Sequence, residues 1–426
     1  MKKKSPKLKI GDKGLGAFAR TRALVPNGNG TMSKVATLPP DEPSYIVRGK
    51  GCRVWDVDGN EYIDFKCCLG PNSLGYCHPS VDEAIRRQLK VGISFGHPNP
   101  LETELAEQLV EVIPCAERVR FLKTGNEAMQ AAFKVARAHS GRDRILSCGY
   151  HGWSHIMRDN RGVPGCVADL RIDYDWGDLA GVERILGERG GEIAAVSLAA
   201  SYAQLTAGDD FPSKLRNLTK AHGVLLIIDE IVTGFRLRIG GFHEYYGFKP
   251  DLAVFSKALA NGMPISVFCG SREVMSELEN NATVSSTFSG ELLSVAAALA
   301  TLKVYRTEGV IDHLWNIGGR FSSGMNRIFA KHGLPLSWKG LAPCTFLTPE
   351  SGNAGLDDRL RRSLFRHSLR HGLMFYHALY VNFSHKEADI DEALARFDLV
   401  CRNVDPDSEL SAQEPRRPVI GALANR

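Results

Sequence analysis

The chain has 426 residues, of which 43% are apolar and 24% are charged, and its formal net charge at pH 7 is +5. These values are typical of a soluble globular protein that is longer than one ordinary domain. No apolar run reaches the ~20 residues that a membrane span needs, and the basic residues are dispersed, which argues against a membrane partner and a nucleic-acid partner. The basic stretch 1–6 lacks the apolar segment of a secretory signal, so we expect a cytoplasmic protein.

The ten cysteines show no spacing that is typical of a metal site. Cys67 and Cys68 are adjacent, the others are scattered, and no Cys-x-x-Cys pair indicates zinc or redox chemistry. We therefore expect buried thiols that form no disulfide and bind no metal.

The first segment, residues 1 to about 44, is rich in Gly, Pro and Lys. Its run from Gly11 to Gly16 is superficially similar to a dinucleotide-binding loop, but no strand pattern precedes it, and we assign it no function. A β-hairpin is predicted next, because residues 53–57 and 61–65 alternate polar and apolar side chains on either side of a turn at 58–60.

From about residue 80 to 300, helical and strand-like patterns alternate. Helical periodicity covers 101–112, 127–140 and about 291–306, and strand-like stretches cover 119–122, 145–147, 194–198, 224–228, 252–255 and 267–269. Such alternation predicts an α/β fold with a mostly parallel sheet and helices on both of its faces.

Four parts of the chain follow from these patterns. Residues 80–308 form the predicted large domain, which carries the candidate site. Residues 1–79 are an N-terminal segment that includes part of a smaller domain, and 309–402 mix helices and short strands and complete that domain. The many Pro and charged residues of the segment 403–426 predict a flexible tail.

Two of the predicted strands end on ionisable residues. The run 225–228 leads into Asp229, and 252–255 leads through Ser256 into Lys257. Either residue alone would most often be a solvated strand edge or a helix cap. The pair favours another interpretation, since pyridoxal 5'-phosphate (PLP) needs a lysine that bonds its carbonyl carbon and an acidic partner for its ring nitrogen. Glu230 is expected to point to the opposite face, with a structural role.

Three turns add candidate ligand groups. Residues 124–127 (Thr-Gly-Asn-Glu) join a strand to a helix, where backbone N–H groups suit a phosphate; the alternative is an ordinary helix cap. Tyr150 and His151 follow the next strand, and an aromatic ring there could stack on a pyridine ring or fill a gap in the core. The turn that begins at Thr287 precedes a long helix and is ambiguous alone.

In this order, these residues make the chain resemble the class III PLP-dependent aminotransferases of fold type I, especially the branch of the glutamate-1-semialdehyde 2,1-aminomutases. The resemblance covers about residues 45 to 395. Other stretches that carry it are Trp55-Asp56-Val57-Asp58-Gly59, Gly70-Pro71, Leu74-Gly75-Tyr76, His78-Pro79, Ser94-Phe95-Gly96, Thr233-Gly234-Phe235-Arg236 and Pro250-Asp251-Leu252. It implies PLP as the cofactor, a large domain on a mostly parallel seven-stranded sheet flanked by helices, and a smaller α+β domain from both chain ends.

The resemblance also implies roles for individual residues. Lys257 matches the Schiff-base lysine, and Asp229 matches the partner of the pyridinium nitrogen. Thr287 matches the threonine that reaches the phosphate of the neighbouring subunit's cofactor, which implies a homodimer with its active sites at the interface. The other cofactor-binding residues that it implies are the phosphate cradle Thr124, Gly125 and Asn126, the stacking Tyr150 with His151, and Gln204 near the phenolic oxygen.

Three departures from the aminomutases concern substrate handling. The segment 153–165 is shorter than the stretch that closes over their site, Ala199-Ala200 replaces a Glu-Pro pair, and His377 stands where they have a glutamate. A mutase must retain its diamine intermediate, so a short lid favours release.

We therefore expect an aminotransferase that works by a ping-pong mechanism on a small-molecule amine donor and a carbonyl acceptor. A PLP mutase or racemase is the first alternative, because it would share every residue named above. An idle scaffold of the same fold is the second, and it is disfavoured because a scaffold needs neither Lys257 nor Asp229.

Overall fold

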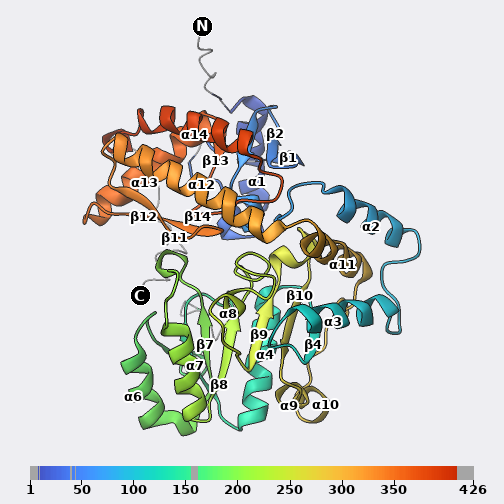
Figure 1. Ribbon diagram of the computed structural model, residues 1–426. Helices are drawn as coiled ribbons and strands as arrows, with labels where there is room; N and C mark the ends of the chain where they lie inside the picture. The colour runs from blue at the N-terminus through green and yellow to red at the C-terminus, as the bar shows by residue number, and fades with distance from the viewer. Residues whose placement is uncertain (1–7, 9, 39–40, 44, 155–161, 410–426) are drawn as a thin grey trace. The chain divides into compact units, whose positions relative to one another are not determined.

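The structure is a computed structural model that describes residues 8, 10–38, 41–43, 45–154 and 162–409. The chain forms two compact units (Figure 1). The central unit lies within Pro79–Ile311, and the terminal unit draws on both chain ends, Met1–His78 and Asp312–Leu423.

A seven-stranded sheet forms the middle of the central unit, as the resemblance implies. Its strand order is β4-β10-β9-β8-β7-β5-β6. The strands are β4 (Arg118–Leu122), β5 (Arg144–Cys148), β6 (Arg171–Asp173), β7 (Ile193–Ala199), β8 (Leu225–Asp229), β9 (Leu252–Phe255) and β10 (Ser266–Gly270). All neighbours are parallel except at β10, which runs antiparallel to both β4 and β9. The prediction of a mostly parallel sheet is therefore confirmed. The connection from β9 to β10 holds no α-helix, and an antiparallel pair needs no crossover helix.

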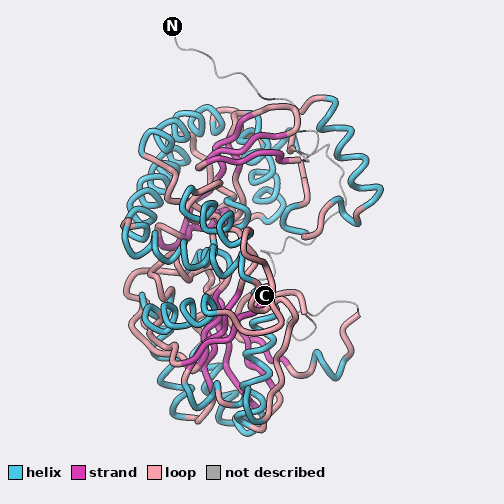
Figure 2. The backbone as a smooth tube through the Cα atoms, turned by 90° about the vertical axis from the view of Figure 1, so that its right-hand side faces the viewer, coloured by secondary structure: helices cyan, strands magenta, loops and turns pink. Residues whose placement is uncertain are grey.

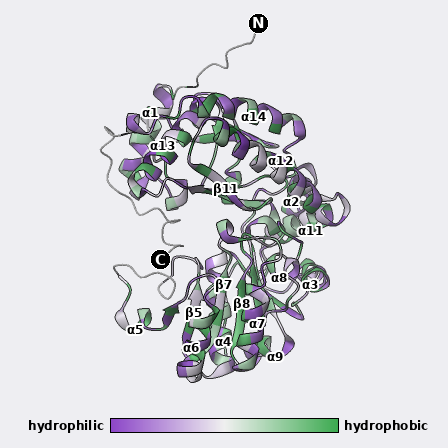
Figure 3. Ribbon diagram, turned by 60° about the vertical axis from the view of Figure 1, so that its left-hand side comes forward, coloured by the Kyte–Doolittle hydropathy of each residue, from purple (hydrophilic) through white to green (hydrophobic). Residues whose placement is uncertain are grey.

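Helices lie on both sides of this sheet (Figure 2). The helices of the central unit are α2 (Pro79–Leu89), α3 (Pro100–Val112), α4 (Gly125–Ser140), α5 (Gly165–Ala168), α6 (Leu179–Arg189), α7 (Phe211–Ala221), α8 (Phe242–Tyr245), α9 (Arg272–Met275), α10 (Glu277–Asn280) and α11 (Leu292–Thr307). The inner strands β7, β8 and β9 are apolar except for Ser197 and Asp229 (Figure 3), because helices cover both faces of a parallel sheet.

Helix α4 is the main support of one sheet face. Its apolar side, which includes Met129, Phe133 and Ala136, is fully buried in the same core cluster as Ile227 and Val254 of the sheet. The helix ends at Gly141, which adopts the left-handed conformation (φ 64°) that terminates many helices. This packing holds the N-terminus of α4 in a fixed place beside the strand ends.

The terminal unit contains two smaller sheets. One has the order β1-β2-β3-β13 and the other β11-β12-β14. These strands are β1 (Ile46–Lys50), β2 (Arg53–Asp56), β3 (Glu61–Asp64), β11 (Leu336–Leu341), β12 (Cys344–Pro349), β13 (Leu373–Met374) and β14 (Ala378–Leu379). The helices are α1 (Asp12–Leu24), α12 (Val310–Lys331), α13 (Ala354–Arg370) and α14 (Glu387–Cys401). The predicted hairpin is confirmed as β2–β3, and Ile63 pairs with Leu373, which joins the two ends of the chain in one sheet.

Some local features differ from the predictions. The glycine run at 11–16 begins helix α1, and the backbone N–H groups of Gly11 and Gly14 donate to the Asp58 carboxylate at 3.0 and 3.1 Å. The ten cysteines are free thiols, but Cys68 is half-buried and Cys77 and Cys166 are exposed rather than buried. Within the described residues, we find no helix with the length and apolar character needed to cross a membrane.

Candidate functional site

The pairing of the strands places the carboxyl ends of six of them, all except β10, at one edge of the central sheet. Leu198 of β7 pairs with Cys148 of β5 and with Ile228 of β8, and β9 runs parallel beside β8. β4 reaches the same edge through the antiparallel β10, where Ser266 pairs with Leu122. In open α/β sheets, ligands bind at this edge.

Most of the candidate residues end or follow these strands. The structure brings to this edge Thr124, Gly125, Asn126, Tyr150, His151, Gln204, Asp229 and Lys257. Thr287 lies instead in the exposed turn that precedes α11. That turn is linked to the same edge, since Lys123 and Glu291 form a half-buried ion pair of 2.8 Å.

Asp229 is the buried carboxylate of the site. It is the last residue of β8, and only 7% of it is exposed. Its Oδ1 accepts the backbone N–H of Ile231 at 3.0 Å, and its Oδ2 lies 2.9 Å from Nδ1 of His151. A buried carboxylate is costly unless it is hydrogen-bonded, and these two bonds hold it in one orientation.

His151 connects Asp229 to a residue that the sequence analysis missed. The imidazole is buried, and its Nε2 lies 3.1 Å from the hydroxyl oxygen of Ser197, a fully buried residue of β7. The edge of the ring meets Phe133 of α4 at a centroid distance of 6.1 Å. A signal was available in the sequence, because Ser197 is the only polar residue in the apolar run 193–199.

Lys257 follows β9 and has a strained backbone. Its φ is 42°, in the left-handed region that non-glycine residues seldom occupy. The preceding residue is fixed, since the hydroxyl of Ser256 donates to the carbonyl oxygen of Ile265 at 2.8 Å. Strain of this kind is maintained where the surrounding structure fixes it, and it is frequent at functional sites.

The N-terminus of α4 offers two backbone donors. Thr124 and Glu127 form a reciprocal capping box at the start of the helix. The hydroxyl of Thr124 accepts the backbone N–H of Glu127, and the carboxylate of Glu127 accepts the N–H of Thr124 at 2.8 Å. Among the described residues, no protein acceptor bonds the N–H groups of Gly125 and Asn126. Two such groups at the positive end of a helix dipole suit a phosphate.

Gly125 has no room for a side chain. A Cβ atom at this position would lie 2.5 Å from Cδ1 of Ile231, so the loop after β8 packs directly on the start of α4. We expect Gly125→Ala to lower the free energy of unfolding by about 1–3 kcal/mol and to weaken PLP binding, because either residue must move. Denaturant unfolding and a PLP titration of the apoprotein measure the two effects.

The matched control is Gly187→Ala in α6, where a Cβ would meet nothing within 4 Å. Alanine is the better helix former there, so the control is expected to be neutral or slightly stabilising. Adding Ile231→Ala to Gly125→Ala removes the colliding atoms and should restore PLP binding. Equal behaviour of the 125 and 187 variants would contradict the packing argument.

The loop after β5 is held by the side chain of Asn126. Its Oδ1 accepts the backbone N–H of Trp153 at 3.0 Å and the hydroxyl of Ser154 at 2.8 Å. Tyr150 lies on this loop with 47% of its surface exposed, so its ring is accessible to a ligand. Gln204 ends the short helical turn after β7, and its side chain is exposed. The proposed short lid falls partly on residues 155–161, which lie outside the described part of the chain.

Glu230 belongs to a separate buried cluster. Its carboxylate accepts the hydroxyl of Thr233 at 2.5 Å and the backbone N–H of Phe242 at 2.7 Å, and it lies 2.9 Å from Nδ1 of His243. Burial alone would lower the pKa of His243, but hydrogen bonds to Cys115 and Glu230 raise it to about 10. These contacts give Glu230 a structural role within a buried cluster.

His377, the residue that departs from the aminomutase pattern, lies in the terminal unit between β13 and β14. Its ring packs against Phe346, Phe365 and Tyr376. Burial, followed by the positive charge of Arg361, lowers the pKa of His377 to about 4.

This low pKa predicts a loss of stability in acid. In the unfolded chain His377 binds a proton below about pH 6.5, whereas in the folded protein it does so only near pH 4. The contribution of neutral His377 to the free energy of unfolding is therefore complete above about pH 6.5. It falls by up to about 3 kcal/mol as the pH drops to 4. His377→Phe suits the aromatic surroundings and should reduce this loss, as urea unfolding at several pH values would measure. An unchanged acid dependence would contradict the prediction.

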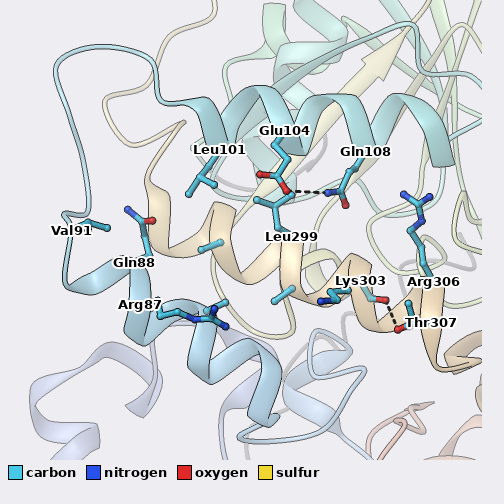
Figure 4. Close-up of a pocket in the computed structure, with 13 residues that line it drawn as sticks. Arg87, Gln88, Val91, Leu101, Glu104, Gln108, Leu299, Lys303, Arg306 and Thr307 are labelled. Carbon is cyan, nitrogen blue, oxygen red and sulfur yellow. Dashed lines mark hydrogen bonds between the residues drawn. The ribbon is translucent and has the colours of Figure 1, made fainter.

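A groove of about 710 Å³ lies elsewhere in the central unit, between α2, α3 and α11 (Figure 4). Leu101 and Leu299 contribute apolar walls, and Arg87 and Lys303 contribute charged groups at its sides. None of the candidate residues lines it. The candidate active site is therefore the sheet edge and not this groove.

The residues at the sheet edge fit PLP, the cofactor that the resemblance implies. The N–H groups of Gly125 and Asn126 can bind a phosphate, and the buried carboxylate of Asp229 can accept a ring N–H. Lys257 brings an amine to the neighbouring strand end, where it can bond a carbonyl carbon. The residues at the sheet edge therefore offer partners for the phosphate, the ring nitrogen and the carbonyl carbon of PLP.

Comparison with known proteins identifies the family of the chain. The model of the class III aminotransferase family matches residues 38–157 and 182–376. The glutamate-1-semialdehyde 2,1-aminomutase of Desulfitobacterium hafniense is 33% identical over 410 residues, covering 89% of this chain and 95% of that protein. The 3-aminobutyryl-CoA aminotransferase of Cloacimonas acidaminovorans is 31% identical over 394 residues, covering 90% and 95%.

A solved structure shows the same fold. The FumI protein of Sphingopyxis sp. MTA144, determined in a form that carries PLP, is 26% identical, with a TM-score of 0.86 over 95% of this chain and 99% of that one. The family match covers well over half of the chain, and the fold is that of the PLP-dependent transferases of fold type I. The chain therefore belongs to the class III aminotransferases and is an enzyme that uses pyridoxal 5'-phosphate.

Proposed function

We propose that this enzyme transfers an amino group from an amine donor to a separate carbonyl acceptor by a ping-pong mechanism. One observation carries the proposal: a strained lysine and a buried carboxylate, Lys257 and Asp229, lie on neighbouring strands at the edge where the N-terminus of α4 offers two backbone donors. A binding scaffold would gain nothing from a strained lysine and would incur the cost of a buried carboxylate.

Bound PLP supplies a carbonyl group that condenses with amines and a ring that accepts electrons. Lys257 would hold the cofactor covalently, and its Nζ, once free, would move a proton at the substrate's α-carbon. Asp229 would keep a proton on the ring nitrogen, which would strengthen the electron sink. Gly125 and Asn126 would bind the phosphate through their N–H groups, and the ring of Tyr150 could stack on the cofactor.

Intramolecular amino transfer is the second candidate function. A relative that is 33% identical is named glutamate-1-semialdehyde 2,1-aminomutase, and both reactions need the same cofactor-binding residues. His377 and Ala199-Ala200 favour the intermolecular reaction, because they replace groups that the resemblance assigns to substrate handling in the aminomutases.

A half-reaction experiment separates these candidates. The holoenzyme is mixed, without an acceptor, with L-glutamate, L-alanine, ω-amines, 3-aminobutyrate or glutamate-1-semialdehyde, and absorbance and carbonyl product are recorded. Stoichiometric conversion of the cofactor to its amine form with release of a carbonyl product supports the proposal. Reaction with glutamate-1-semialdehyde alone, with 5-aminolevulinate as the product, would establish the mutase. No change with any amine would overturn both.

We also propose that the enzyme is a homodimer in which Thr287 serves the partner's site. Thr287 and Phe288 lie in an exposed turn, and 60% of Phe288 is accessible. The neighbouring loop exposes Val91 (69%) and Phe95 (56%), and it is joined to the start of α11 by a hydrogen bond from Leu292 N–H to the carbonyl oxygen of Ile93 at 2.9 Å. Exposed apolar side chains on two joined segments are typical of an interaction surface.

Subunit complementation tests this assignment. In mixed dimers of Lys257→Ala and Thr287→Ala chains, one site would combine an intact Lys257 with the intact Thr287 of the other chain. Activity above that of either parent is therefore expected after mixing. If Thr287 acted within its own chain, mixing would restore nothing, and a monomeric enzyme in sedimentation would overturn the dimer.

A further inference from the structure

Asp229 is the first of three buried residues, from three strands or strand ends, that form a continuous hydrogen-bonded series. Asp229 Oδ2 lies 2.9 Å from Nδ1 of His151, and Nε2 of the same ring lies 3.1 Å from the hydroxyl of Ser197. Their exposed fractions are 7%, 1% and 0%. Water has little access to the series, so each member depends on its protein partners.

The partners determine which nitrogen of His151 carries the hydrogen. An ionised carboxylate only accepts hydrogen bonds, so Nδ1 must be the donor to Asp229. In the singly protonated ring Nε2 is then an acceptor, and the hydroxyl of Ser197 can donate to it. In the other tautomer the Nε2–H could still bond Ser197, but the ring would present a lone pair to the carboxylate. Ser197 therefore completes the arrangement in which His151 donates to Asp229.

The series also limits how Asp229 can rotate. Its Oδ1 is held by Ile231 N–H at 3.0 Å and its Oδ2 by His151. Ser197 is itself fixed in the sheet, where its carbonyl oxygen accepts the hydroxyl of Tyr174 at 3.1 Å. A rigid strand residue thus orients a ring, and the ring orients a carboxylate.

We propose that Ser197 is a positioning residue for the cofactor: it holds the His151 ring in the orientation in which Nδ1 faces Asp229, and so keeps Asp229 directed toward the ring nitrogen of PLP. This inference rests on the proposed role of Asp229. A residue that does not touch the cofactor can still affect its binding, because it fixes the orientation of the residue that does.

Ser197→Ala removes the hydroxyl, and Ser147→Ala is the matched control. Ser147 is a buried serine of β5 that pairs in register with Ser197, and its hydroxyl makes no hydrogen bond to His151 in the described part of the chain. Three quantities are measured for each protein: the Kd of the apoprotein for PLP, the pH at which the absorbance of the bound cofactor changes, and the thermal midpoint of the apoprotein.

The expected result is a rise of about three- to tenfold in the PLP Kd of Ser197→Ala, with a displaced absorbance transition. Ser147→Ala should match the parent in both, and Ser197→Thr, which keeps a hydroxyl, should recover most of the loss. In a His151→Phe background, Ser197→Ala should add nothing, because the residue acts through His151.

Two results would overturn the inference. One is an unchanged PLP Kd and absorbance transition in Ser197→Ala, with only a lower thermal midpoint. The other is an effect that persists in the His151→Phe background. Failure of the proposed role of Asp229 would look different, since Asp229→Asn would then leave the cofactor's absorbance and Kd unchanged.

Discussion

Lys257→Ala is expected to abolish turnover while leaving a folded protein that still binds PLP. In the proposed mechanism Lys257 bonds the cofactor and moves the proton at the substrate's α-carbon, so without its amine kcat should fall by about 10⁴-fold or more. The phosphate donors of Gly125 and Asn126 and the carboxylate of Asp229 are untouched, so PLP should remain bound without a covalent link. Borohydride reduction followed by mass measurement distinguishes a covalent from a non-covalent cofactor.

A second substitution at this position separates chemistry from strain. The φ of Lys257 is 42°, which alanine tolerates poorly and glycine tolerates well. Lys257→Gly should therefore be more stable than Lys257→Ala by about 1 kcal/mol, and both should be inactive. Partial recovery of activity on addition of small primary amines would support the proton-transfer role. Normal turnover by either variant would show that another amine performs the reaction.

Asp229→Asn should have the second-largest effect. The substitution preserves the shape of the side chain and its bond from Ile231 N–H, but it removes the negative charge that would hold a proton on the ring nitrogen. We expect kcat to fall by about 10²–10³-fold, and the absorbance of the bound cofactor to change, since the electron sink is weakened. Steady-state kinetics and a pH series of absorbance spectra measure both effects.

Asp251→Asn is the matched control for a carboxylate of the same unit. Asp251 forms a bidentate salt bridge with Arg216, with N···O distances of 2.6 and 2.9 Å, and accepts the backbone N–H of Leu226 at 2.7 Å. Removal of the Asp251 charge should lower the thermal midpoint of unfolding without changing the absorbance spectrum of the cofactor. If the Asp229 and Asp251 variants differed only in stability, Asp229 would have no special role toward the cofactor.

Local pattern determined the secondary structure well where the elements are long or strongly apolar. The helix predicted at 127–140 is α4, whose observed start at Gly125 follows from the capping of Thr124. The strands predicted at 252–255 and 194–198 are β9 and β7 within one residue at each end. Periodicity reports burial, and these segments bury whole faces. Helix α1 was missed because its face is weakly apolar and its glycines oppose helix formation.

The sequence by itself determined the fold class, the cofactor and the order of the candidate residues, because strand-end positions and glycine turns are local features that can be read from neighbouring residues. Only the tertiary structure decided which of these residues meet. The series from Ser197 through His151 to Asp229 joins positions that are 46 and 78 residues apart, and the approach of Ile231 explains why position 125 is glycine. Such contacts arise from the register of parallel strands, in which the ends of distant segments are brought to one edge of the sheet.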